Sequence, residues 1–241
     1  MYDLRCVDAL TGLASLEAGS VDLIASDLPY GVTHNKWDTI IPLDEMWNEF
    51  QRVLSPQGIV ALTACQPFTS QLVMSNPKMF KYEIIWEKTM ASNQMLANKR
   101  PLRIHESILI FYNKYGVYNE QRLEGKPYKS KFAGSNTSTY ANGTPSFEID
   151  NDGWRHARSI LKVSNPRNKG GHPTQKPVPL FDWIIRTYTN AGQTVLDPTM
   201  GSGTTGVAAV GLNRNFIGFD ISEEWCDVSR KRIEAVTPEV K

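Results

Sequence analysis

The sequence contains few of the residues that build disulfide frameworks or metal sites. Its 241 residues include three cysteines, Cys6, Cys65 and Cys226, which are widely spaced. This pattern indicates free thiols in a reducing compartment rather than disulfide bonds or a zinc site. The four histidines also have no companion at metal-ligand spacing, so we predict that the protein binds no metal.

Long apolar runs and a strong net charge are also missing. No segment approaches the roughly 18 consecutive apolar residues of a membrane span, and residues 1–5 lack the pattern of a signal peptide. Hydrophobic residues make up 41% of the chain and charged residues 21%, which is typical of a globular protein. The formal net charge is only +1, so any surface for nucleic acid must be a local patch.

The sequence instead contains short apolar strands that alternate with amphipathic helices. Strands are expected at residues 21–26, 58–63, 82–86, 107–112, 194–196 and 216–219. Helices are expected at residues 42–54, 67–74, 177–190, 204–210 and 223–236. This alternation predicts an α/β fold in which a mostly parallel sheet is covered by helices on both faces.

A polar stretch separates the two alternating blocks. Residues 113–169 contain many Tyr, Lys, Asn, Ser and Gly residues and show little apolar periodicity. Such a stretch is too long for an ordinary connection within a compact domain, so it is functional, partly disordered, or both. We therefore divide the chain into segments 1–112, 113–169 and 170–241. A shorter polar loop is expected at residues 87–106, between two strands.

A glycine-rich turn follows the strand that ends at Asp197. The residues Gly201-Ser202-Gly203-Thr204-Thr205 lead from this turn into a helix. Glycines allow a ligand to approach the backbone closely, and a helix start presents free N–H groups. Asp220 ends the next strand, where a carboxylate can hold the hydroxyls of a ribose. The pattern predicts a site for an adenosine-containing cofactor. NAD is one candidate, and a simple tight turn is the structural alternative.

The tetrapeptide Asp27-Leu28-Pro29-Tyr30 follows the buried strand at 21–26. It suits the methylation of an aromatic amine, whose nitrogen is a poor nucleophile because its lone pair is delocalised. The Asp27 side chain and the Leu28 carbonyl could accept the two amino hydrogens, since Pro29 holds Leu28 extended. Tyr30 could stack on a base that is flipped out of a duplex. Alone, the tetrapeptide could also be an ordinary turn.

In this order, the two motifs resemble the beta class of DNA amino-methyltransferases, in which the catalytic motif precedes the cofactor motif. The resemblance covers residues 4–112 and 172–236. It implies a circularly permuted, Rossmann-like methyltransferase sheet with a small target-recognition insertion at 113–169, and S-adenosyl-L-methionine as the cofactor. It also implies a cytoplasmic enzyme encoded by a bacterium or phage, as in restriction–modification systems.

The resemblance also assigns roles to single residues. Asp27, Leu28, Pro29 and Tyr30 are implied to be catalytic. The segment 5–10 resembles the family's opening strand, whose acid contacts the cofactor adenine. The segment 172–177 resembles the one that lines the methionine part of the cofactor. The complete predicted cofactor-binding set is Asp8, Ala9, Lys176, Asp197, Thr199, Gly201, Ser202, Gly203, Thr204, Thr205 and Asp220.

DNA is the expected partner, and the candidates for contact with it are basic or aromatic residues in two loops, the one that follows the tetrapeptide and the one at 87–106. These candidates are Lys36, Trp37, Lys88, Lys99, Arg100 and Arg103. Glu106, by contrast, is interpreted as a structural residue. The resemblance is also compatible with a homodimer, because relatives often pair.

The nature of the acceptor base depends mainly on Asp27. In the family, an acid at this position goes mainly with adenine and a serine with N4 of cytosine, so Asp27 favours N6 of adenine. Leu28 replaces the more frequent proline, which leaves the role of its carbonyl intact. Three alternatives stay open: N4-cytosine methylation on the same scaffold, methylation of RNA or of a protein amide, and an inactive DNA-binding subunit.

Overall fold

The computed structural model describes residues 1–31, 38–134, 145–165 and 175–237. The chain forms two compact units, one of Met1–Asn119 with Ser159–Lys241 and the other of Glu120–Arg158. The second unit is shorter than the polar segment 113–169 that we separated from the sequence. The reason is that the end of this segment adds a strand to the sheet of the first unit.

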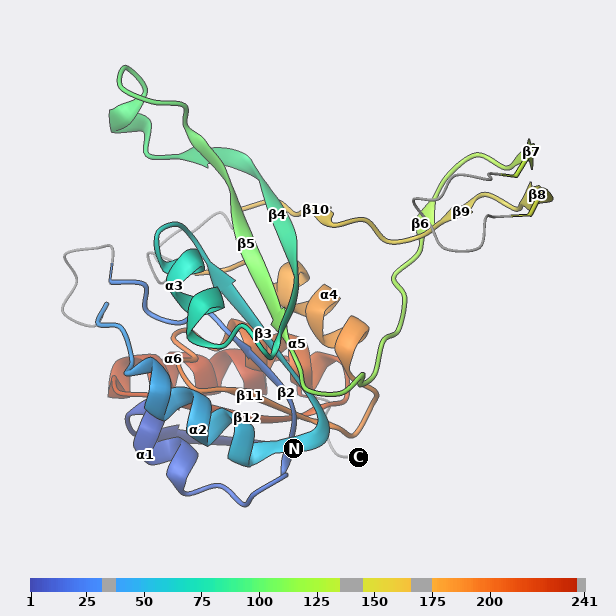
Figure 1. Ribbon diagram of the computed structural model, residues 1–241. Coiled ribbons are helices and arrows are strands. Elements are labelled where there is room, and N and C mark those ends of the chain that lie inside the picture. The colour runs from blue at the N-terminus through green and yellow to red at the C-terminus, as the bar shows by residue number, and fades with distance from the viewer. Residues whose placement is uncertain (32–37, 135–144, 166–174, 238–241) are drawn as a thin grey trace. The chain divides into compact units, whose positions relative to one another are not determined.

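An eight-stranded sheet forms the centre of the first unit, with the strand order β1-β12-β11-β2-β3-β5-β4-β10 (Figure 1). Its strands are β1 (Tyr2–Cys6), β2 (Val21–Ser26), β3 (Leu54–Ala64), β4 (Phe80–Ser92), β5 (Arg103–Phe111), β10 (Ile160–Lys162), β11 (Thr194–Asp197) and β12 (Asn215–Asp220). Neighbouring strands are parallel except for β3–β5 and β4–β5. The predicted α/β fold with a mostly parallel sheet is thereby confirmed.

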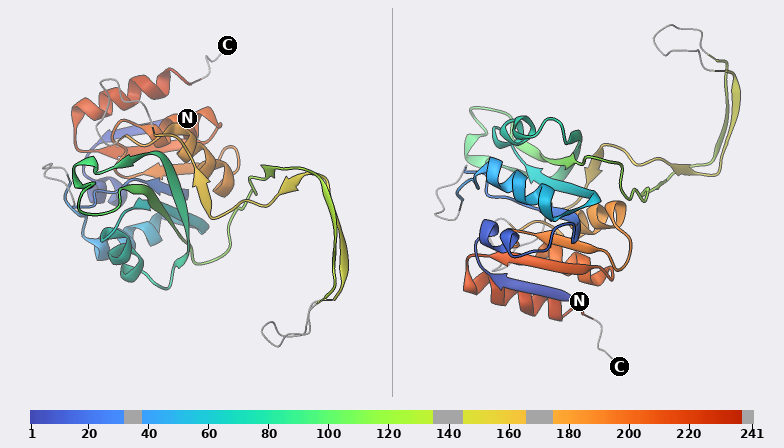
Figure 2. Two further views of the ribbon diagram at one scale, coloured as in Figure 1. Left: turned by 90° about the horizontal axis from the view of Figure 1, so that it is seen from above. Right: turned by 60° about the horizontal axis from the view of Figure 1, so that its bottom comes forward.

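Among the described residues, three helices cover each face of the sheet, and Figure 2 shows α2 and α6 on opposite sides of it. One face carries α1 (Ala9–Ala14), α2 (Leu43–Val53) and α3 (Phe68–Ser75), and the other α4 (Val178–Tyr188), α5 (Thr204–Gly211) and α6 (Glu223–Glu234). Strand side chains alternate between the two cores, since successive residues of a strand point to opposite faces. Leu23 and Ala25 join the α4–α5 core, whereas Ile24 joins the α1–α2 core.

The chain leaves β2 and β11, two neighbouring parallel strands, in opposite directions. From β2 it continues through α2 to β3, and from β11 through α5 to β12. In open α/β sheets, such a reversal leaves a crevice beyond the carboxyl ends of the two strands, where ligands bind. The sheet order therefore places the ends of the tetrapeptide strand and of the glycine-turn strand side by side.

Two local expectations were wrong. The loop predicted at 87–106 is mostly a long hairpin, because β4 runs on to Ser92 and β5 begins at Arg103, with a short 3₁₀ turn, η1 (Gln94–Leu96), at the tip. Cross-strand backbone pairing such as Glu87 with His105 outweighs the polar composition. The strand expected at 5–10 ends at Cys6, because Asp8 caps α1 by accepting a hydrogen bond from the Thr11 backbone N–H at 3.0 Å.

The described residues of the second unit form two antiparallel ribbons. These are β6 (Leu123–Glu124) with β9 (Trp154–Arg155), and β7 (Tyr128–Phe132) with β8 (Phe147–Asn151). In the β7–β8 ribbon, Lys129 pairs with Asp150 at 2.7 Å and Lys131 with Glu148 at 3.3 Å. Both lysines therefore have a carboxylate opposite them on the same ribbon.

Among the residues that the structure describes, no helix is long and apolar enough to cross a membrane.

Candidate active site

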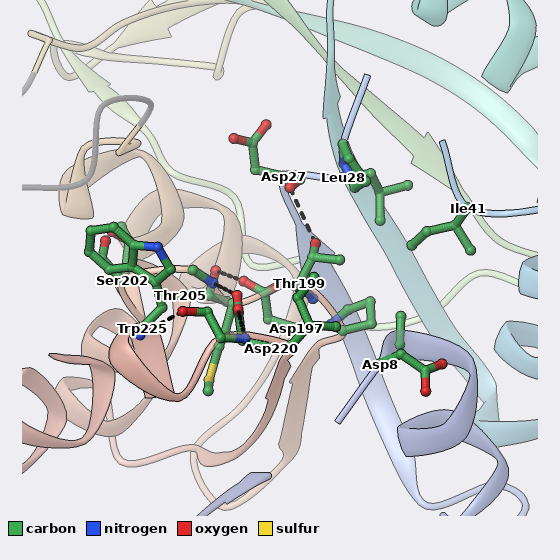
Figure 3. A pocket seen from close by; sticks show the side chains of 18 of the residues that line it. Asp8, Asp27, Leu28, Ile41, Asp197, Thr199, Ser202, Thr205, Asp220 and Trp225 are labelled. Atoms are coloured by element: carbon green, nitrogen blue, oxygen red, sulfur yellow. Dashed lines mark hydrogen bonds between the residues drawn. The ribbon is translucent and has the colours of Figure 1, made fainter. Parts of the chain in front are cut away.

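A cavity of about 490 Å³ lies beyond the carboxyl ends of β2 and β11 (Figure 3). This volume is within the range of small-molecule sites, roughly 300–1,000 Å³. Its wall includes three residues of the tetrapeptide, Asp27, Leu28 and Pro29. It also includes every member of the predicted cofactor-binding set except Gly203, namely Asp8, Ala9, Lys176, Asp197, Thr199, Gly201, Ser202, Thr204, Thr205 and Asp220.

Gly203 has a packing role next to this wall. Its backbone has φ of +74°, and a Cβ at this position would lie 2.8 Å from the Cβ of Ser229 on α6. Only glycine combines that left-handed conformation with so close an approach. The Ser229 hydroxyl in turn donates a hydrogen bond of 2.7 Å to the Gly201 carbonyl. The turn is therefore held against α6 while its first part faces the cavity.

Asp197 connects the glycine turn with the tetrapeptide strand. Its buried carboxylate accepts hydrogen bonds from the hydroxyls of Ser26 and Thr205, both at 2.6 Å. Burial raises the pKa of Asp197 to about 6, although these hydrogen bonds favour the ionised form. Thr199 adds a second link, because its hydroxyl donates to the Asp27 carbonyl at 3.2 Å (Figure 3). The two motifs thus share one hydrogen-bonded network.

The other two acids of the cofactor set lie at the ends of neighbouring strands. Asp220 accepts backbone hydrogen bonds of 2.9 Å from both Gly201 and Ser222. Cys6, the last residue of β1, pairs with Asp220 of β12, so Asp8 comes to the same edge of the sheet. The hydrogen bonds from Thr11 lower the pKa of Asp8. The carboxylates of Asp8 and Asp220 therefore line the same cavity as hydrogen-bond acceptors.

The Asp27 carboxylate is held by three donors from three separate segments. Its Oδ1 accepts from the hydroxyls of Tyr30 and Thr63, each at 2.5 Å. Its Oδ2 accepts from Lys176 Nζ, also at 2.5 Å. A carboxylate offers about four lone-pair positions, so one acceptor position remains on Oδ2. The arrangement leaves Asp27 able to accept one further hydrogen bond.

Tyr30 supports Asp27 and is not part of the cavity wall. Its ring stacks on Phe68 with centroids 5.3 Å apart, so a base could use only the face that Phe68 leaves. Lys176 Nζ lies 5.5 Å from the centre of the same ring. Burial, followed by the negative charge of Asp27, raises the pKa of Tyr30 well above its usual range. Tyr30 is thus a neutral hydrogen-bond donor.

Lys176 lies between two carboxylates. Besides Asp27, its ammonium faces Glu106 Oε2 at 3.4 Å. Burial would lower the pKa of Lys176, but the charges of Asp27 and Glu106 outweigh it and raise that pKa. Burial likewise opposes ionisation of Glu106, and Lys176 and Lys88 overcome it and lower the pKa of Glu106. Lys176 and Glu106 are therefore both charged near neutral pH.

The six candidates for DNA contact have different surroundings. Lys88 is buried and forms an ion pair with Glu106, so its ammonium is not offered to a DNA phosphate, contrary to our prediction. Lys99 and Arg100 are exposed, and Arg103 is half-buried. Arg100 and Arg103 line a second cavity of about 260 Å³, between the end of β3 and the part of the β4–β5 hairpin nearest its tip. Lys36 and Trp37 lie outside the described residues.

Several residues of the site were missed in the sequence. Thr63 contacts Asp27 and Glu106 contacts Lys176. The cavity wall also contains Thr39, Ile40, Ile41, Gln175, Phe181, Ile221, Ser222 and Trp225. Glu106 offered one signal: an acid that opens an apolar strand is rarely buried without a partner. Within the described part of the chain, no group of three or more His, Cys, Asp or Glu residues could hold a metal ion.

A family model described as DNA methylase, N6_N4_Mtase, matches residues 21–231 of this chain. The chain belongs to this family of DNA methylases. This confirms the predicted class of DNA amino-methyltransferases. It also favours S-adenosyl-L-methionine over NAD as the cofactor of the glycine turn. The circular permutation stays a prediction.

Individual relatives align over most of the chain. The type II methyltransferase M.HpaI of Haemophilus parainfluenzae is 29% identical over 249 residues, covering 96% of this chain and 74% of the relative. The DNA adenine methyltransferase YhdJ of Escherichia coli K12 is also 29% identical, over 95% of this chain and 82% of the relative. A solved complex of M1.HpyAVI with S-adenosylmethionine is 26% identical, with a TM-score of 0.65, over 96% of this chain and all of that one.

Proposed function

We propose that this protein transfers the methyl group of S-adenosylmethionine to N6 of a flipped-out adenine at specific sites in DNA. The observation that carries the proposal is the position of Asp27. Its carboxylate, with one acceptor position left, borders a cavity whose wall contains the glycine turn and two further acids, Asp8 and Asp220. A carboxylate that can accept a hydrogen bond from an amino group and a pocket suited to a nucleoside therefore lie in one crevice.

The residues of the cavity fit S-adenosylmethionine. Thr204 lines the cavity, and its buried hydroxyl has no hydrogen-bond partner among the described residues, which suits a polar ligand. Asp220 would hold the ribose hydroxyls and Asp8 the adenine amino group, while Ile221 and Trp225 supply apolar wall. Lys176 would lie near the carboxylate of the methionine part. This cofactor supplies an electrophilic methyl group on a sulfonium centre.

The chain's own residues would act on the acceptor amine. Asp27 Oδ2 would accept one amino hydrogen and the Leu28 carbonyl the other, which favours a more tetrahedral nitrogen with its lone pair directed at the methyl donor. Tyr30, Thr63 and Lys176 hold the Asp27 carboxylate in place for this contact. Most of the acceleration would come from alignment of the two reactants rather than from a general base.

Adenine is the favoured acceptor for two reasons. Position 27 is an acid, which goes mainly with adenine in this family, and the relative YhdJ is an adenine methyltransferase. The family description covers both N6 and N4 enzymes, so N4 of cytosine is the competing acceptor. We also propose that Lys99, Arg100 and Arg103 contact DNA and that the unit Glu120–Arg158 contributes to target recognition. A homodimer stays a prediction.

Transfer of tritium from labelled S-adenosylmethionine tests the proposal. The assay compares duplexes in which the candidate acceptor base is adenine with duplexes in which it is cytosine. The labelled nucleoside is then recovered and identified. We expect label on adenine, and label on cytosine would contradict the acceptor assignment. Absence of label on any nucleic acid would contradict the DNA methyltransferase assignment itself.

Asp27→Ala separates chemistry from cofactor binding in the same assay. We expect turnover to fall at least about 100-fold, since a directed acceptor is removed from the reacting nitrogen, while calorimetry shows S-adenosylmethionine binding within about 3-fold of wild type. Asp182→Ala is the matched control, because Asp182 forms a surface ion pair with Arg186 on α4. Loss of cofactor binding in Asp27→Ala would contradict this division of roles.

A further inference from the structure

Three buried charged side chains form a row that leads to the half-buried carboxylate of Asp27, the proposed catalytic group. Lys88 on β4 pairs with Glu106 Oε1 on β5, and Glu106 Oε2 faces Lys176 Nζ at 3.4 Å. Lys176 Nζ then contacts Asp27 Oδ2 at 2.5 Å. Lys88, Glu106 and Lys176 are each less than one-tenth exposed. The formal charges of the four groups alternate in sign along this row, so their sum is zero.

The two oxygens of Glu106 have different partners. Oε1 accepts a hydrogen bond from Lys88 across the β4–β5 pairing. Oε2 is buried and accepts no hydrogen bond from any described residue, so the ammonium of Lys176 at 3.4 Å is the neighbour that offsets its desolvation. Glu106 thus has one oxygen fixed by the hairpin and the other directed at Lys176.

A lysine ammonium needs such help to be placed well. It is a compact charge with three donors on a flexible four-carbon stem, unlike the planar fork of arginine. Asp27 by itself would attract Lys176 without fixing it, and the ammonium could then cover the last acceptor position of Oδ2. A second carboxylate on the rigid β5 strand attracts the ammonium from another direction and so restricts where it can lie.

We propose that Glu106 is a positioning residue of the methyl-transfer reaction, which holds the Lys176 ammonium so that Asp27 Oδ2 keeps one acceptor position open for the amino group of the base. Glu106 acts through Lys176 and touches neither reactant. The inference rests on the proposed function, since it concerns the same Asp27. It differs from our interpretation of Glu106 as a structural residue, which requires only that Glu106 neutralise Lys88.

A pair of variants separates the two roles. Glu106→Gln removes the charge that faces Lys176, but also leaves Lys88 buried without a carboxylate, so the melting temperature should fall. The double variant Lys88→Met with Glu106→Gln removes both charges and leaves the neutral pair of Lys176 with Asp27. Glu87→Gln is the matched control, because Glu87 lies on the neighbouring β4 strand and pairs with Lys162 at 3.4 Å.

We expect the double variant to recover most of the melting temperature while its kcat stays at least about 10-fold below wild type, with the KM for S-adenosylmethionine changed less than about 3-fold. Glu106→Gln alone should show the same loss of kcat, and Glu87→Gln none. Recovery of kcat together with the melting temperature in the double variant would overturn the proposal, since Glu106 would then serve only Lys88. A loss confined to KM would overturn it as well.

The same measurements keep this inference apart from the proposed function. Wild-type protein that methylates adenine, together with a Glu106→Gln variant of unchanged kcat, would overturn the inference alone. Wild-type protein that methylates no nucleic acid would overturn the proposed function and the inference together.

Discussion

Lysine–carboxylate pairs occur in two very different surroundings in this protein. Lys176 and Asp27 are joined at 2.5 Å, with side-chain exposures of 9% and 26%. Lys129 and Asp150 are joined at 2.7 Å on the β7–β8 ribbon, with exposures of 80% and 73%. The distances are nearly the same, so the chemistry differs through burial. A buried charge depends on its partner, whereas water can replace the partner of an exposed one.

The two pairs also differ in which parts of the fold supply the contacting residues. The Asp27 site gathers donors from β3, from the segment before α4 and from its own tetrapeptide. The ribbon pairs join residues that lie opposite each other on two directly paired strands. A change at the first site therefore reaches several elements, and a change at the second should remain on the ribbon.

The largest effect is expected from Lys176→Met. This variant removes the cation shared by the buried Glu106 and the half-buried Asp27, which should cost about 3–5 kcal/mol of the free energy of unfolding. Turnover should fall at least about 100-fold. Chemical denaturation and single-turnover methylation check the two effects. Lys129→Met is the matched control and should change the free energy of unfolding by less than about 1 kcal/mol. Equal effects of the two variants would refute the contrast.

A smaller effect should appear in the pH dependence of stability through Asp197. Burial raises its pKa in the folded protein to about 6, against an ordinary value of 3.8. Between these values the folded state binds more protons than the unfolded state, so this group makes the free energy of unfolding fall as pH rises from about 4 to 6. The total change should be about 3 kcal/mol.

Urea denaturation of wild type and Asp197→Asn at pH 4, 5, 6 and 7, without cofactor, measures this effect. The difference between the two proteins cancels the titration of all other groups. Stability of the wild type relative to the variant should decrease as pH rises through this window and then level off above it. A difference that is constant with pH, or that grows with pH, would contradict the raised pKa.

The smallest effect is expected on the ribbon. A double-mutant cycle of Lys129→Ala and Asp150→Ala should give a coupling energy below about 1 kcal/mol, which added salt reduces further. Hydrogen exchange of the backbone amides in β7 and β8 measures the stability of the ribbon in each variant, from which the coupling energy follows. A coupling energy above about 2 kcal/mol would show that exposure to water does not weaken the ribbon pairs relative to the ion pair at Asp27.

Much of the fold could be predicted because its signals are local. The strand β2, predicted at 21–26, has the same bounds in the structure, and helices predicted at 204–210 and 223–236 correspond to α5 and α6 within two residues at each end. These elements have a clear apolar period and clear ends. The hairpin arms at 87–92 and 103–106 were missed, because their polar residues carry no such period and pairing between the strands defines them.

The sequence by itself determined the alternation of strands and helices, the order of the two motifs and the residue types at positions 27 and 201–205. Each of these depends on neighbours a few residues away. Only the tertiary structure decided that Lys88 is buried rather than offered to DNA, and that Thr63, Glu106 and Lys176 converge around Asp27. Those contacts join the residue after β2 and residues of β3 and β5 with the segment before α4. The pairing and packing of distant elements, which no local pattern encodes, bring them together.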